Sequence, residues 1–200
     1  MGLVAYSDAD WAGCPDTKRS TFGYSIFLGN NIVSWSAKKQ PTVSRSSCES
    51  QYYALAFTAA KVLWLTHLLR DIRVTLTHRP LLLCDNKSAI FLSSNPLSHK
   101  RAKHIDLDYH FLCELVVAGT LHLQHVPSHL QLVDIFTKSV SQDLYVFFRS
   151  KLRVCVNPTL SLRGAVENSS KSIIDLRNPP WWAVENFNKS IIDLRNPPWL

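Results

Sequence analysis

The chain lacks the features that mark secreted, disulfide-bonded and membrane proteins. Its five cysteines are odd in number, widely spaced and without a C-x-x-C pair, which argues against both a disulfide framework and a zinc site. No apolar run reaches bilayer-spanning length, and no basic segment followed by an apolar run opens the chain as a secretory signal would. We therefore expect an intracellular protein, cytoplasmic or nuclear, with no membrane partner.

Acidic side chains are outnumbered by basic ones. The chain carries 22 Lys and Arg against 15 Asp and Glu, a formal net charge of +7 over 200 residues. This excess favours an anionic partner such as nucleic acid over an acidic ligand or a small-molecule substrate. Hydrophobic residues make up 46% of the chain, which is enough to bury one core, so one domain is the default expectation.

Apolar periodicity and turn residues predict an α/β domain. The predicted strands are 3–6, 21–28, 32–35, 81–84 and 121–126, and the predicted helices are 46–70, 86–94, 105–118, 130–138 and 143–152. Ser46 and Glu49 fit a capping box at the start of the long helix, and 38–41 is expected to be a basic loop. The order of elements indicates a five-stranded mixed sheet with helices on both faces.

Carboxylates stand where two predicted buried strands end. Asp8 follows the first strand closely, and Asp85 comes directly after the continuous apolar run 81–84. An acid at a strand end can point into a cleft, although an aspartate there also commonly caps a turn. The strands alone leave both interpretations open.

The ordered motifs of residues 3–152 decide between these interpretations through a resemblance. The motifs are YSDADWAG at 6–13, DTKRSTFGY at 16–24, SWSAKKQPTVSRSS at 34–47, LWLTHLLR at 63–70, LCDNKSAI at 83–90, KHIDLDYHF at 103–111 and HVPSHLQLVDIFTK at 125–138. Together they resemble the ribonuclease H domain of the Pol polyprotein of Copia-type LTR retrotransposons. The resemblance implies a ribonuclease H-like fold over residues 1–152.

The resemblance also implies a metal-dependent nuclease. Ribonucleases H cut the RNA strand of RNA–DNA hybrids during reverse transcription with two Mg²⁺ ions, or Mn²⁺, held by four carboxylates. Asp8, Asp85 and Asp134 match three of these positions, and Gln51 stands where the family has glutamate. Glu49 is not expected to substitute, because two helix positions turn its side chain about 200° away. We therefore expect impaired catalysis in this copy.

Further residues are candidate contacts for the hybrid. Lysines and arginines in the predicted loops could follow the phosphates of a hybrid or could form a solvated face. These residues are Lys18, Arg19, Lys38, Lys39, Arg45, Lys100, Arg101 and Lys103. His129 could assist product release or could simply be solvated. Asp10, Asp106 and Asp108 are interpreted as surface acids.

Residues 153–200 fall outside the resemblance. The segment 165–182 recurs as 183–200, an 18-residue period, and each copy ends in Pro-Pro-Trp followed by one more residue. Two copies cannot build a solenoid, and the prolines terminate any local helix. We expect a loosely ordered extension, with a tryptophan-rich interaction peptide as the alternative.

Two functions remain open from the sequence. The chain is either a working hybrid-specific endonuclease, normally joined to a reverse transcriptase domain in a polyprotein, or a catalytically dead fragment that at most binds nucleic acid. Gln51 and the repeated tail favour impaired catalysis.

Overall fold

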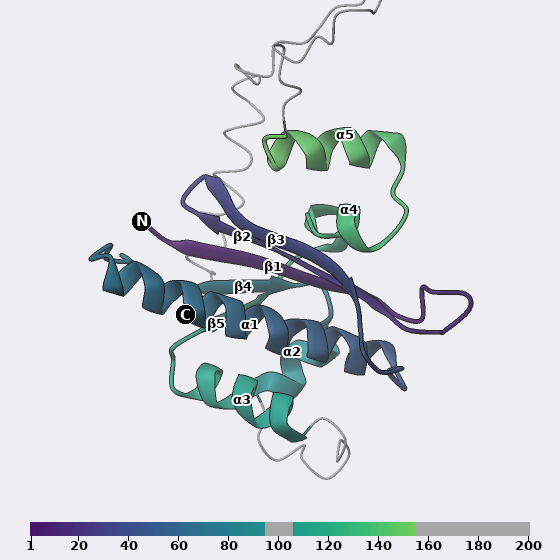
Figure 1. The fold of residues 1–200 in the computed structure, drawn as a ribbon, viewed down its shortest axis with the longest axis horizontal. Helices are drawn as coiled ribbons and strands as arrows, with labels where there is room; N and C mark the ends of the chain where they lie inside the picture. Colours follow the sequence, from purple (N-terminus) through teal and green to yellow (C-terminus); the bar gives the residue numbers. More distant parts are fainter. Residues whose placement is uncertain (95–105, 155–200) are drawn as a thin grey trace, which may run out of the picture. The chain divides into compact units, whose positions relative to one another are not determined.

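A computed structural model describes residues 1–94 and 106–154 (Figure 1). Residues Met1–Leu152 form one compact unit. The strands are β1 (Leu3–Asp10), β2 (Thr21–Leu28), β3 (Asn31–Lys39), β4 (Leu81–Cys84) and β5 (His122–His125). The helices are α1 (Ser47–Asp71), α2 (Lys87–Ser94), α3 (Asp106–Val117), the 3₁₀ turn η2 (Ser128–Leu130), α4 (Asp134–Thr137) and α5 (Gln142–Lys151). The repeats 165–182 and 183–200 lie outside the described residues.

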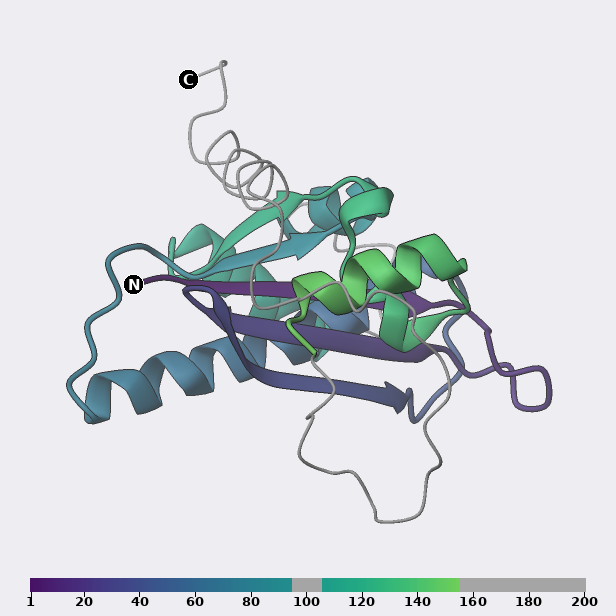
Figure 2. The ribbon, with the colours of Figure 1, turned by 90° about the horizontal axis from the view of Figure 1, so that it is seen from above.

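The five strands form one mixed sheet in the order β3-β2-β1-β4-β5. β1 pairs antiparallel with β2 and parallel with β4, and β4 pairs parallel with β5. Helices α1, α2 and α3 cover one face, and α4 and α5 lie on the other (Figures 1 and 2). The predicted α/β class, a five-stranded mixed sheet with helices on both faces, is confirmed.

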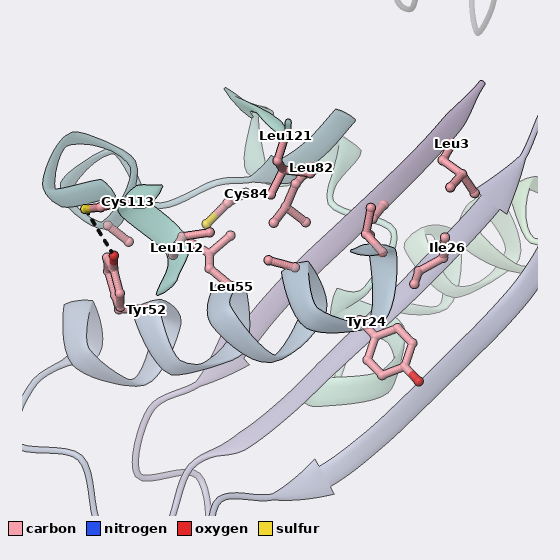
Figure 3. Close-up of a cluster of buried hydrophobic side chains, with 14 of the residues drawn as sticks. Leu3, Tyr24, Ile26, Tyr52, Leu55, Leu82, Cys84, Leu112, Cys113 and Leu121 are labelled. Carbon is pink, nitrogen blue, oxygen red and sulfur yellow. Dashed lines mark hydrogen bonds between the residues drawn. The ribbon is translucent and has the colours of Figure 1, made fainter. Parts of the chain in front are cut away.

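The main core lies between the sheet and α1 and α3. Tyr52 and Leu55 of α1 pack in one cluster with Leu82 of β4 and Leu112 of α3, and all four side chains are buried (Figure 3). Tyr52 and Leu55 are three residues apart and so belong to one apolar stripe along α1. Anchoring this stripe on the sheet fixes which way the first turns of α1 face, and those turns contain Gln51.

Ser46 begins α1 as the capping box predicts, with one difference. Its side-chain oxygen accepts a hydrogen bond from the Glu49 backbone N–H at 3.1 Å. The Glu49 carboxylate accepts from the backbone N–H of Arg45 at 2.9 Å, one residue before the cap whose N–H was expected. Glu49 is thus held at the helix start, as its predicted capping role requires.

Three predicted elements differ from the structure by more than one residue at an end. β1 continues through Asp10 because Asp8 and Asp10 pair with Gly23 and Thr21 of β2, so Asp8 lies within the strand. β3 continues through Lys39, whose partner is Thr21, so the expected basic loop at 38–41 is half strand.

The predicted helix 130–138 is the third of these elements. Residues Ser128–Leu130 form a 3₁₀ turn and only Asp134–Thr137 form an α-helix. Gln131, between them, is buried and extended, and it donates from Nε2 to the carbonyl of Ser7 in β1 at 3.0 Å, a tertiary contact that interrupts the predicted helix. Among the described residues, no helix combines the length and apolar character needed to cross a membrane.

Candidate metal centre

Three aspartates from distant parts of the sequence meet at one end of the sheet. Asp8 lies in β1, Asp85 directly follows β4, and Asp134 is the first residue of α4. One carboxylate oxygen from each lies within 4.8 Å of the others. Because β1 and β4 are parallel neighbours, their carboxyl ends reach the same edge, which brings Asp8 and Asp85 together.

Asp8 is the buried centre of this cluster, with no exposed surface, while Asp85 and Asp134 are half-buried. Its Oδ2 accepts a short hydrogen bond from the Thr137 hydroxyl. Its Oδ1 accepts a hydrogen bond from Gln51 Nε2 at 2.7 Å. Both oxygens of Asp8 are therefore held in fixed directions.

Gln51 reaches the cluster from the second turn of α1. Its Nε2 also donates to the backbone carbonyl of Ala9 at 3.0 Å, and its Oε1 lies 3.8 Å from the Cys84 sulfur. The structure thus places Gln51 against Asp8, and its role together with Asp85 and Asp134 stays a prediction. The neutral Gln51 amide adds no negative charge to the cluster, and its NH₂ group donates a hydrogen bond to Asp8.

Lys138 is a member of the cluster that the sequence reasoning did not single out. Its Nζ lies 3.1 Å from Asp134 Oδ1 and 3.4 Å from Asp8 Oδ2. Burial lowers the pKa of Lys138, but Asp8 and Asp134 raise it more, so the net pKa is raised and the ammonium stays charged. The signal was present in the sequence, because a lysine four residues after Asp134 on a helix faces the same side.

The pKa of Asp134 is raised to about 6, first by burial and then by the nearby charge of Asp8, with Lys138 acting in the opposite direction. The carboxyl is therefore ionised above about pH 6 and available as a ligand at neutral pH. Three carboxylates from rigid elements form a hard oxygen donor set, which suits Mg²⁺ or Mn²⁺. The residues present fit a divalent cation site.

The chain was compared with known proteins, and no protein-family model matches it. It is 44% identical over 158 residues to the retrovirus-related Pol polyprotein from transposon RE2 of Arabidopsis thaliana, a match covering 79% of the chain and 11% of the relative. It is 33% identical over 145 residues to the Pol polyprotein from transposon TNT 1-94 of Nicotiana tabacum, covering 72% and 11%. The chain is homologous to a segment of retrotransposon Pol polyproteins.

The family resemblance read from the motifs is thereby confirmed. The chain spans about a tenth of the length of the curated Pol relatives that it matches along most of its own length. Among solved structures, the N-terminal RNase H domain of rv2228c from Mycobacterium tuberculosis matches at 15% identity with a TM-score of 0.48. That match covers 68% of this chain and 91% of the solved one.

Five of the predicted nucleic-acid residues of this Pol segment are described. Lys18 and Arg19 are exposed in the β1–β2 loop, Lys38 and Lys39 end β3, and Arg45 precedes α1. These stretches meet at the aspartate end of the sheet, because Trp11 Nε1 donates to the Ser44 carbonyl at 3.0 Å and Gln40 N–H donates to the Ser20 carbonyl at 2.8 Å. Lys39 also donates to the Cys14 sulfur at 3.2 Å. Lys100, Arg101 and Lys103 lie outside the described residues.

His129 lies in η2, exposed, in the loop that approaches Asp85. The neighbouring Ser128 hydroxyl donates to Asp85 Oδ2 at 3.1 Å, so this loop borders the cluster. The Asp10 carboxylate lies next to Gly13, where an added Cβ would come within 1.9 Å of it. The interpretation of Asp10 as a surface acid stays a prediction.

Gln51→Glu should destabilise the metal-free domain. The new carboxylate would lose the Asp8 and Ala9 hydrogen bonds and place a second negative charge against buried Asp8. We expect the free energy of unfolding in EDTA at pH 8 to fall by about 1–3 kcal/mol, and Mg²⁺ to restore it. Urea denaturation with and without Mg²⁺ measures both, and Gln142→Glu, an exposed position of α5, is the matched control. Unchanged stability in EDTA would contradict the contacts described for Gln51.

Proposed function

We propose that residues 1–152 are the ribonuclease H domain of a retrotransposon Pol polyprotein, with catalysis impaired in this copy. The observation that carries the proposal is the meeting of Asp8, Asp85 and Asp134 at one end of the sheet, with Gln51 completing the group. The substrate is the RNA strand of an RNA–DNA hybrid. Residues 153–200 are proposed to be an extension outside this domain.

The residues have distinct roles in this proposal. Two bound Mg²⁺ or Mn²⁺ ions would supply an activated water and steady the leaving oxygen. Asp8, Asp85 and Asp134 would hold them, and the Thr137 hydroxyl keeps the Asp8 carboxylate oriented. Three carboxylates supply less negative charge than the four positive charges of two such ions require, and neutral Gln51 does not make up the difference. Weak metal binding is the proposed cause of impaired catalysis.

The proposed partners follow from charge and from the relatives. The basic residues Lys18, Arg19, Lys38, Lys39 and Arg45 lie near the same end of the sheet as the aspartates. Lysines and arginines in such a position would follow phosphates without reading sequence, so binding should weaken as salt rises. In the parent polyprotein we propose that the domain is joined to a reverse transcriptase and acts inside the cell, in cytoplasmic particles or in the nucleus.

The second candidate function is a catalytically dead binding module. Gln51 favours it, because the amide satisfies Asp8 Oδ1 without any metal. In that case the chain would bind hybrids through its basic loops and cut neither strand.

A hybrid with different labels on its RNA and DNA strands tests the proposal. We expect the chain to bind this hybrid in a salt-sensitive manner, and Gln51→Glu to cut the RNA strand only, in Mg²⁺ and not in EDTA. Cutting of the DNA strand, or cutting that survives EDTA, would overturn the assignment. Binding without cutting in both proteins would favour the dead module.

A further inference from the structure

The contact of Lys138 with two of the proposed metal ligands goes beyond the metal site itself. The ammonium lies 3.1 Å from Asp134 and 3.4 Å from Asp8, within ion-pair distance of both carboxylates. Because Asp8 Oδ1 already accepts a hydrogen bond from Gln51, a divalent cation shared with Asp134 would be directed to Asp8 Oδ2, the oxygen that Lys138 contacts. An ammonium and a metal ion cannot both occupy the space between the two carboxylates.

We propose that Lys138 is an internal counter-cation of the carboxylate cluster, which competes with a divalent cation for Asp8 and Asp134 and is displaced when that cation binds. This inference rests on the proposed metal site and adds a residue that sets its affinity. It gives Lys138 a positioning and gating role toward the cation, without contact to the reacting atoms.

Charge balance supports this role. Three ionised aspartates carry a charge of −3, and the Lys138 ammonium brings the net charge of the cluster to −2. Asp8 has no exposed surface, so without a cation its charge would be buried with only the hydrogen bonds from Thr137 and Gln51 to stabilise it. Buried carboxylates need a partner charge or strong hydrogen bonds, and Lys138 supplies the charge.

The geometry also allows Lys138 to leave. Its side chain is 35% exposed, whereas Asp8 is fully enclosed, so the ammonium can swing into water without moving the carboxylates. Lys138 directly follows α4 as its C-terminal cap, and its backbone N–H donates to the Asp134 carbonyl at 3.1 Å. Displacing the ammonium therefore requires side-chain rotation alone.

The first test measures the reactivity of Lys138 in the unsubstituted chain. Acetylation of lysines at pH 8, read by mass spectrometry, is compared with and without saturating Mn²⁺. We expect Mn²⁺ to raise labelling of Lys138 and to leave Lys61 unchanged, since Lys61 is exposed on α1 and lies 5.8 Å from the Phe57 ring. Unchanged labelling of Lys138 while Mn²⁺ is bound overturns the inference.

The second test measures Mn²⁺ affinity in Lys138→Met, Lys138→Arg and the control Lys61→Met. Removing a positive charge within 4 Å of two ligands should tighten Mn²⁺ binding by at least about tenfold in Lys138→Met. Lys138→Arg keeps the charge and should stay close to the unsubstituted chain, as should Lys61→Met. Equal or weaker affinity in Lys138→Met overturns the inference.

The two proposals fail in different ways. Mn²⁺ can bind the chain without changing the labelling of Lys138, and with the same affinity in Lys138→Met. In that case only the counter-cation role is lost. If Mn²⁺ binds neither the unsubstituted chain nor Lys138→Met, the metal site and the proposed function fall together. If Lys138→Met does not fold, labelling of the unsubstituted chain alone decides.

Discussion

Gln51→Glu should cut an RNA–DNA hybrid at least about 100-fold faster than the unsubstituted chain in Mg²⁺, a change of about 2.7 kcal/mol in the barrier. The residue already lies against Asp8, with 2.7 Å between Gln51 Nε2 and Asp8 Oδ1, so no rearrangement of α1 is needed to bring a fourth carboxylate to the cluster. The substitution adds the negative charge that the proposed pair of divalent ions lacks. Initial rates on a labelled hybrid at pH 8 measure the effect.

The control for this gain is Gln142→Glu, which makes the same chemical change at an exposed position of α5. It should leave the rate unchanged. The new charge is exposed to solvent, so salt screens its interaction with the aspartate cluster and with the hybrid. Equal rates in the Gln51→Glu and unsubstituted proteins would mean that three aspartates suffice, and that Gln51 does not explain any impairment. A similar gain in Gln142→Glu would contradict a local role for residue 51.

Asp8→Asn, introduced into the Gln51→Glu protein, should return cleavage to background, a loss of at least about 100-fold. Asp8 is the one aspartate of the cluster with no exposed surface. Its Oδ1 accepts a hydrogen bond from Gln51, and its Oδ2 accepts one from Thr137. Asparagine keeps the size of the side chain and removes the charge that would hold a cation. Rates are compared at equal concentrations of folded protein.

Asp16→Asn is the control for this loss, since Asp16 is an exposed acid of the β1–β2 loop. It should retain the rate of the Gln51→Glu protein. Thermal melts of both variants separate a lost metal ligand from a lost fold. Cleavage that survives Asp8→Asn in a folded protein would remove Asp8 from the proposed machinery.

Most of the fold followed from local patterns. Ser46 marks the start of α1, helical spacing places Tyr52 and Leu55 on the core face, and the apolar run Leu81–Cys84 is an interior strand of the sheet. These features depend on residues close in sequence, where capping and periodicity act. The placement of residue 51 next to Asp8 follows once α1 is anchored by that stripe.

The structure differs from the sequence predictions where tertiary contacts determine the bounds of an element. Asp8 is held inside β1 by pairing with Gly23, and Gln131 is drawn to the Ser7 carbonyl, so the predicted late helix shrinks to α4. No local pattern reports a partner more than a hundred residues away, as in the Gln131 and Thr137 contacts with β1. The contact of Lys138 with Asp8 is of the same kind, because it joins the end of α4 to β1 across the fold.

A Mn²⁺ titration of the unsubstituted and Gln51→Glu proteins at pH 8, with free Mn²⁺ read by electron paramagnetic resonance, tests the central claim most directly. At this pH Asp134 is ionised, because its pKa is about 6. The claim that residue 51 marks the missing ligand of a carboxylate metal site predicts binding that is at least about tenfold tighter in Gln51→Glu. Identical Mn²⁺ affinities in the two proteins would contradict it.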